Sequence, residues 1–198
     1  MDDRSTRDRL IDQALRLFAE RGYRGATVGD IEAAAGLAPR SGGLYKHFAS
    51  KREVLVAALE RHIGSLEGMH SVMDLLPLAD LRSELTLLVR WALQELAQEL
   101  QLIRIVQRDG HEFPELRDRF RDLVARRGYQ EAAEWMRRKI KEGGFPDYDC
   151  EAAVAVLLGA VVHYRVEEAT FGAPPADVDE ERFVETWVDV CMRLAESA

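Results

Sequence analysis

The sequence is poor in cysteine and contains no long apolar run. Its two cysteines, Cys150 and Cys191, lie far apart and outside the close pairs that bind zinc or perform redox chemistry, so we predict buried or idle thiols. A redox-sensing pair would require their Cα atoms to lie within about 7 Å. The longest apolar run covers residues 152–162, whereas a bilayer span needs about 20 residues. With a charged, polar N-terminus in place of a secretory signal, we expect a cytoplasmic protein and no membrane partner.

Strand-like alternation, internal repeats and low-complexity segments are also absent, and apolar residues recur at helical spacing along the chain. Hydrophobic residues make up 47% and charged residues 31%, which is typical of a packed globular fold. The formal net charge of −8 is unevenly distributed. Residues 1–64 hold 11 Lys and Arg against 9 Asp and Glu, whereas residues 65–198 hold 16 against 26. The N-terminal segment therefore remains a candidate surface for nucleic acid, because the field near the phosphates matters more than the total charge.

Four short helices are predicted in the first 64 residues. Apolar spacing indicates a helix over residues 5–21 that ends at Gly22, and Thr27 begins a second helix with the Thr-x-x-Asp spacing of an N-terminal cap. Pro39 suits the first position of a third helix, because its missing N–H has no partner there. Ser50 and Glu53 form a second capping pair at the start of a linker helix.

Longer helices are predicted in the remaining chain. The apolar pattern places them at about residues 79–100, 103–108, 116–141, 149–170 and 178–196, which gives about nine helices in total. The fold class is therefore all-α. We predict a domain boundary near residue 64: the short helices of residues 1–64 are typical of a DNA-reading module, and residues 65–198 form a larger helical domain.

Three segments carry a resemblance to a known family. Residues 17–23 read LFAERGY, residues 27–31 read TVGDI, and residues 35–51 read AGLAPRSGGLYKHFASK. Together they closely resemble the tetracycline-repressor (TetR) family of bacterial regulators over about residues 7–60. The resemblance implies an N-terminal three-helix helix-turn-helix domain joined by a linker helix to a helical ligand-binding and dimerisation domain. It further implies a homodimeric, ligand-responsive repressor that binds palindromic double-stranded operator DNA and is released by a small-molecule effector.

The chemistry of residues 40–48 fits DNA reading. Leu44 and Phe48 would hold the segment from behind, while polar side chains face a groove about 12 Å wide. Arg40 is the candidate base reader, because a guanidinium bonds bidentately to guanine, although a phosphate clamp is the competing interpretation. The predicted DNA-binding residues are Thr27, Arg40, Ser41, Gly42, Gly43, Tyr45, Lys46, His47 and Lys51. One feature departs from many members of the family: seven residues, rather than five, separate Ala35-Gly36 from Leu44-Tyr45.

Aromatic and polar-tipped side chains on the middle helices form the candidate effector pocket, although core packing is the competing interpretation for each of them. These candidates are Trp91, His111, Phe113, Tyr129, Trp135, Met136 and His163. No cofactor is expected besides the effector.

The last two helices are predicted to pair with their copies in a second subunit, because the first is apolar on nearly every side and the second carries a wide apolar stripe. The predicted dimer interface comprises Val154, Leu158, Val161, Phe183, Trp187, Val190 and Leu194.

Two other function classes remain open at this point. A DNA-binding regulator controlled by a protein partner, rather than by a metabolite, fits the same sequence. A helical-bundle enzyme fits poorly, because Glu67 to His70 is the single Glu-x-x-His spacing, and His163 with Glu167 has no third metal ligand nearby in sequence. We therefore predict no catalytic residues and no metal site.

Overall fold

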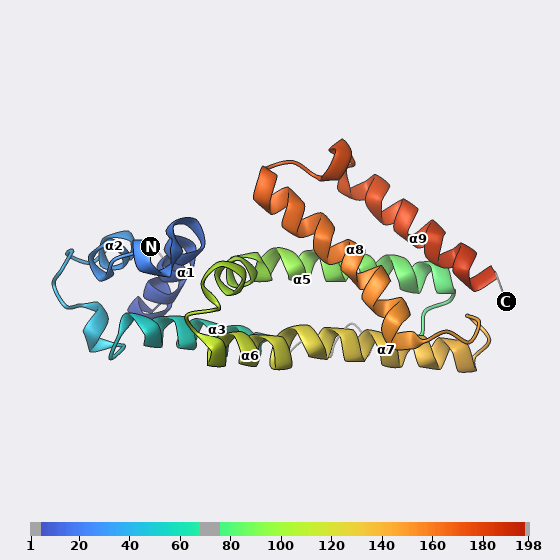
Figure 1. Cartoon of the computed structure of the whole chain (residues 1–198), viewed down its shortest axis with the longest axis horizontal. Coiled ribbons are helices and arrows are strands. Elements are labelled where there is room, and N and C mark those ends of the chain that lie inside the picture. Colours follow the sequence, from blue (N-terminus) through green and yellow to red (C-terminus); the bar gives the residue numbers. More distant parts are fainter. Residues whose placement is uncertain (1–4, 68–75, 197–198) are drawn as a thin grey trace. The chain divides into compact units, whose positions relative to one another are not determined.

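The computed structural model describes residues 5–67 and 76–196, and every regular element in these residues is helical (Figure 1). The fold class is all-α, as predicted. Two compact units divide the chain: unit 1 combines the described residues up to 67 with residues 101–123, and unit 2 combines residues 76–100 with residues 124–196. The predicted domain boundary near residue 64 stays a prediction, since residues 101–123 pack with the N-terminal helices.

Three N-terminal helices form most of unit 1: α1 (Thr6–Gly25), α2 (Val28–Ala34) and α3 (Lys51–Glu67). The side chain of Ser5 caps α1 by accepting a hydrogen bond from the first turn. The predicted break at Gly22 is confirmed by its non-helical φ of 84°, although α1 resumes as far as Gly25. The buried apolar core of these helices includes Leu10, Ile11, Leu17, Phe18, Ile31, Val54, Leu55 and Leu59.

Unit 2 is a bundle of long helices. Its members are the first part of α5 (Leu81–Asp109), α7 (Arg126–Lys141), α8 (Cys150–Phe171) and α9 (Glu180–Glu196). In Figure 1, α8 and α9, coloured orange and red, run side by side in opposite directions. The core of the unit brings together Leu85, Val89 and Leu93 of α5, Trp135 and Met136 of α7, Val154 and Val161 of α8, and Val184, Val188 and Cys191 of α9.

Two helix predictions beyond residue 64 need correction. α5 is continuous where the pattern predicts two helices, because no glycine or proline interrupts the residues between 100 and 103. The predicted helix over 116–141 begins at Pro114 as α6 (Pro114–Phe120) and passes through a π-helical turn at Arg121–Ala125 before α7. Counted as one run, these three segments bring the described residues to seven helices, not about nine. No helix in the described ranges is long and apolar enough to span a membrane.

Candidate nucleic-acid interface

The start of α2 carries the first predicted DNA-contacting residue, Thr27. The predicted capping box is present: the Asp30 N–H donates to Thr27 Oγ1 (3.2 Å), and the Thr27 N–H donates to Asp30 Oδ2 (3.0 Å). The Thr27 hydroxyl also donates to Asp30 Oδ2 at 2.6 Å. These hydrogen bonds lower the pKa of Asp30 below its ordinary value. Thr27 itself is exposed, so its methyl and hydroxyl groups border the outer surface of unit 1.

The recognition segment, residues 37–48, differs from the prediction. No α-helix begins at Pro39; residues 37–43 form turns, and a single 3-10 turn, η1, covers Leu44–Lys46. Arg40 (φ 59°) and Gly42 (φ 73°) have left-handed backbone conformations that interrupt an α-helix. The prediction of a helix from Pro39 is therefore wrong, and the two extra residues of this connection are accommodated as a loop.

The recognition segment nevertheless separates its side chains as predicted. Leu44 is fully buried and Phe48 is 2% exposed, so these two residues hold the segment against the core of unit 1. Tyr45 is 58% exposed although it is a large aromatic residue. Gly42 and Gly43 are half-buried, whereas the remaining polar candidates are exposed: Arg40, Ser41, Lys46 and His47.

Arg40 lies close to α2. A Cβ placed on Gly29 would be 3.2 Å from Arg40 Cγ, which shows that the stem of the arginine crosses the first turn of α2 at this glycine. The left-handed backbone of Arg40 and the missing side chain of Gly29 thus permit this close approach. The packed stem leaves the exposed guanidinium as the part of Arg40 that a ligand can reach.

Lys51 begins α3, and its ammonium group is engaged within unit 1. Lys51 Nζ donates to the main-chain oxygens of Tyr23 (2.6 Å) and Ala26 (2.9 Å), and it lies 4.1 Å from the Tyr23 ring centroid. Burial lowers the pKa of Lys51, against the opposing effect of nearby Asp109 and Glu112. Lys51 therefore caps the C-terminal end of α1. Its predicted phosphate contact stays a prediction. The capping pair predicted for Ser50 and Glu53 is partly formed. The Glu53 N–H donates to Ser50 Oγ (3.1 Å), but the Glu53 carboxylate accepts from the N–H of Ala49 and not from that of Ser50.

Sequence reasoning missed a second set of contacts at the end of α1. The Tyr23 N–H donates to Asp109 Oδ2 (2.9 Å), and Asp109 is 7% exposed. Arg108 donates to the main-chain oxygens of Phe18 and Ala19, which lie in the turn before the break at Gly22. The signal in the sequence is the break itself, because a helix end leaves carbonyl groups that need donors.

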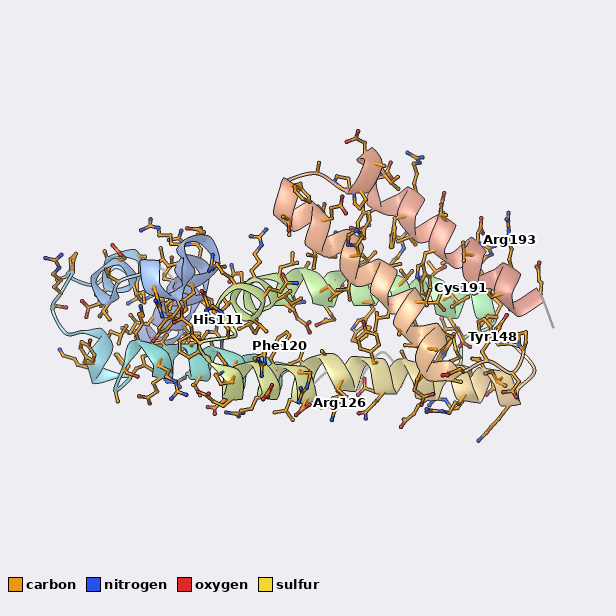
Figure 2. All side chains as sticks on the ribbon, viewed as in Figure 1. His111, Phe120, Arg126, Tyr148, Cys191 and Arg193 are labelled. Atoms are coloured by element: carbon orange, nitrogen blue, oxygen red, sulfur yellow. The ribbon has the colours of Figure 1, made fainter. Side chains whose placement is uncertain are left out.

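The predicted effector residues are divided between the two units. His111 and Phe113 belong to unit 1, where Phe113 packs edge-on against Tyr23 with ring centroids 4.6 Å apart. The His111 side chain, labelled in Figure 2, is 76% exposed. Trp91, Tyr129, Trp135, Met136 and His163 belong to unit 2. Of these, Trp135 and Met136 are buried in its core, whereas the His163 side chain is 71% exposed with Nε2 2.7 Å from Glu167 Oε2.

Unit 2 contains a buried polar cluster that the sequence did not reveal. Glu84 is 1% exposed, and its carboxylate accepts hydrogen bonds from Trp135 Nε1 (3.1 Å), Lys139 Nζ (2.8 Å) and the Leu78 N–H (3.1 Å). Burial opposes the charge on Lys139, but the hydrogen bonds to Glu84 and Glu142 outweigh it and raise the pKa of Lys139. Trp135 is thus fixed in orientation by this cluster as well as by core packing.

Several predicted dimer residues pack within one protomer. Val154 (5% exposed) and Val161 (1%) lie in the core of unit 2. Phe183 stacks on Tyr164 with ring centroids 4.3 Å apart, and Trp187 Nε1 donates to the main-chain oxygen of Leu157 (3.0 Å). Leu158 and Leu194 are partly buried against the same core.

Other apolar side chains face outward instead. Val190 is 47% exposed, as an interface residue on α9 would be in an isolated protomer. Val156 (74%) and Phe171 (75%) of α8 are exposed as well, and sequence reasoning did not select them. Within the described residues, no group of three His, Cys, Asp or Glu side chains is arranged to hold a metal ion.

Family models match both ends of the chain. Residues 10–58 match the model for bacterial regulatory proteins of the tetR family, and residues 88–194 match the C-terminal domain of AefR-like transcriptional repressors. The HTH-type transcriptional repressor KstR2 of Rhodococcus jostii (strain RHA1) is 32% identical over 163 residues, which cover 76% of this chain and 74% of that protein.

Two solved structures have a fold similar to that of this chain. A putative transcriptional regulator from Saccharomonospora viridis, in complex with choline, has a TM-score of 0.70 and 26% identity over 96% of this chain and 95% of the other. AibR, in complex with isovaleryl coenzyme A and operator DNA, has a TM-score of 0.71 and 19% identity over 94% of this chain and 97% of the other. The family models and the Rhodococcus relative together show that this chain belongs to the TetR family of bacterial regulatory proteins.

Proposed function

We propose that the chain is a transcriptional repressor that binds a palindromic operator as a homodimer and leaves it when a small molecule binds to the helices of the C-terminal domain. The DNA contacts are assigned to Thr27, the exposed part of the recognition segment and the start of α3. This proposal extends the family assignment to residues of this chain.

The observation that carries the proposal is the division of the recognition segment into a buried and an exposed side. Leu44 and Phe48 anchor it, while a guanidinium, an ammonium, an imidazole and a phenol stand on the outer side. These groups donate hydrogen bonds to phosphates, and a guanidinium also bonds bidentately to guanine. We therefore assign base reading to Arg40 and phosphate contacts to Tyr45 and His47.

Exposed apolar groups on α8 and α9 support the homodimer. Val156, Phe171 and Val190 would leave water if these helices met their copies in a second subunit. The two-fold symmetry of such a dimer places half-sites about 34–36 Å apart, or at a multiple of that distance.

The core of unit 2 is the candidate region for the effector. It offers Met136, with Tyr129 packed against the same core, as apolar contacts, and Trp91 of the same unit is half-buried. The solved structures with bound choline or isovaleryl coenzyme A show that related folds hold small molecules. An apolar or aromatic effector fits this composition. It would act by favouring one arrangement of the two DNA-binding heads over the other.

The full-length chain can be tested by selection from a random pool of DNA duplexes. We expect enrichment of a palindrome, and we expect binding to the enriched duplex to weaken steeply with salt. The matched variants are Arg40→Ala, which should relax preference at one position of each half-site, and Arg82→Ala, which removes an exposed arginine of unit 2 and should leave preference unchanged. Failure of the chain to enrich any sequence would contradict the proposal.

A further inference from the structure

Beneath the recognition segment lies a buried carboxyl group, that of Glu32, to which the proposed function gives no role. Glu32 stands on α2 among apolar neighbours and is 0% exposed. Its Oε1 accepts a hydrogen bond from the Leu44 N–H (2.9 Å), and its main-chain oxygen accepts one from the Leu37 N–H (2.8 Å). One residue of α2 therefore holds both ends of the loop that carries Arg40.

The second oxygen of this carboxyl group, Glu32 Oε2, is buried and makes no hydrogen bond within the described part of the chain. A buried polar atom without a partner costs free energy, so stability alone does not account for a carboxyl group at this position. The carboxyl group can instead be explained by conformational specificity, because a buried polar group can fix one arrangement of the chain.

The packing around the carboxyl group is close. A Cβ on Gly43 would lie 3.0 Å from Leu37 Cδ1 and 3.7 Å from Glu32 Oε1. Gly43 has an ordinary helical backbone (φ −60°, ψ −36°), so the close approach of Leu37, rather than backbone strain, disfavours a larger residue here. A methyl group at Gly43 would therefore press against Leu37 at one end of the loop, next to the carboxyl group of Glu32.

The loop also needs such an anchor for a general reason. A recognition helix fixes the positions of its side chains through its own hydrogen bonds, whereas residues 37–43 are not helical. A bond from the Ser41 N–H to the Ala38 main-chain oxygen (3.2 Å) bridges one turn within the loop. The position of the Arg40 side chain relative to that of Tyr45 therefore depends on contacts from outside the loop.

We propose that Glu32 is a positioning residue for DNA reading. Its carboxyl group fixes where η1 begins, and through Leu44 it sets the position of the exposed side chains on either side, Arg40 and Tyr45. The proposal rests on the proposed function, because it concerns the same DNA-contacting segment. Glu32 acts through these residues and does not itself touch DNA.

Two substitutions of similar size test the role of the acceptor. Glu32→Gln keeps an oxygen for the Leu44 N–H, whereas Glu32→Met removes it. The measured quantity is selectivity, the ratio of Kd for a scrambled duplex to Kd for the duplex that the wild-type chain enriches from a random pool. Melting followed by circular dichroism shows that each variant is folded.

We expect the selectivity of Glu32→Gln to stay within about threefold of wild type and that of Glu32→Met to fall about tenfold or more. The fall should come from weaker binding to the enriched duplex, because contacts to phosphates do not depend on sequence. A purely structural residue would change the melting temperature and leave the selectivity of the folded protein unchanged.

Gly43 provides a second test that does not alter the carboxyl group. Gly43→Ala should lower selectivity by pushing against Leu37, and adding Leu37→Val, which removes the Cδ1 atom, should restore it. Equal selectivity of wild type and Glu32→Met would overturn the role of Glu32 while leaving operator binding in place, and equal selectivity of wild type and Gly43→Ala would show that DNA reading does not depend on the position of Leu37. If the wild-type chain enriches no sequence, the proposed function fails, and the role of Glu32 fails with it.

Discussion

Removal of the buried carboxylate in unit 2 should destabilise the protein far more than removal of an exposed ion pair. Glu84→Met keeps the volume of the side chain but leaves Lys139, Trp135 Nε1 and the Leu78 N–H without their shared acceptor. Loss of one partner from a buried ion pair costs about 3–5 kcal/mol. We expect the lower end of this range, about 3 kcal/mol, because Lys139 keeps a second partner in Glu142 at 3.1 Å.

Two variants calibrate this value. Arg82→Ala breaks the pair between Arg82 and Asp189, whose side chains are both 55% exposed, and it should cost less than about 1 kcal/mol. The double substitution Glu84→Met with Lys139→Met removes both charges. It should regain at least half of the loss, because a buried ion pair is often replaced by apolar groups at little cost.

The assay is urea unfolding followed by tryptophan fluorescence and circular dichroism. All variants must be compared at one protein concentration, because the apparent stability of a dimer depends on concentration. If Glu84→Met costs no more than Arg82→Ala, the carboxylate does not hold α5 and α7 together, and the reasoning from its three hydrogen bonds is wrong.

Three further variants address the DNA-binding unit and the dimer. If Lys51 contacts a phosphate, Lys51→Ala should reduce the slope of the logarithm of the DNA-binding constant against the logarithm of the salt concentration by about one unit. A lower melting temperature with an unchanged slope would show that Lys51 contacts only the main chain of Tyr23 and Ala26 and no phosphate. The pKa of Asp30 is lowered, so its charge stabilises the folded state above its ordinary pKa of 3.8 and loses this effect as the pH falls below it. The difference in melting temperature between wild type and Asp30→Asn should therefore shrink as the pH falls below that value, and a constant difference would contradict the assignment. Val156→Glu should yield monomers in sedimentation without unfolding the protomer, because Val156 is 74% exposed; a stable dimer of this variant would exclude Val156 from the interface.

The parts of the fold that sequence predicted correctly depend on residues close together in the chain. The capping box of α2 joins residues three apart, and the pair at the start of α3 follows the same spacing. The buried positions of Leu44 and Phe48 follow from helical spacing over four residues. Local hydrogen bonding and apolar periodicity thus suffice to place these elements.

The wrong prediction of a helix from Pro39 shows where inference from neighbouring residues in the sequence fails. Proline at a first helical position and apolar residues four apart favour a helix, but Gly42 and Gly43 oppose it, and the sequence does not state which effect prevails. The structure shows that Arg40 itself adopts φ 59°, an uncommon conformation for a residue with a side chain. That conformation is held by neighbours on α2, which periodicity within the segment does not include.

The predicted dimer face stays a prediction, because the same limit of local patterns applies to it. An apolar residue on α8 can face the core of its own protomer or a partner, and the sequence pattern of the helix is the same in both cases. Val161 became core (1% exposed), whereas Val156, five residues earlier, faces outward (74%). A charge at Val161 would therefore disturb the protomer itself, so Val156 is the better position for a test of dimerisation.

The chemistry of the candidate site and its geometry have different origins in the sequence. Arg40 and Tyr45 are identified by the groups that they carry, but their positions depend on contacts made from elsewhere: Glu32 reaches Leu44 across 12 residues, and Lys51 reaches the end of α1 across 25 and 28 residues. Such contacts follow from the folded chain and not from its local pattern. If Glu32 positions the recognition segment as we propose, a substitution at such a supporting residue changes DNA reading although the residue itself does not touch DNA.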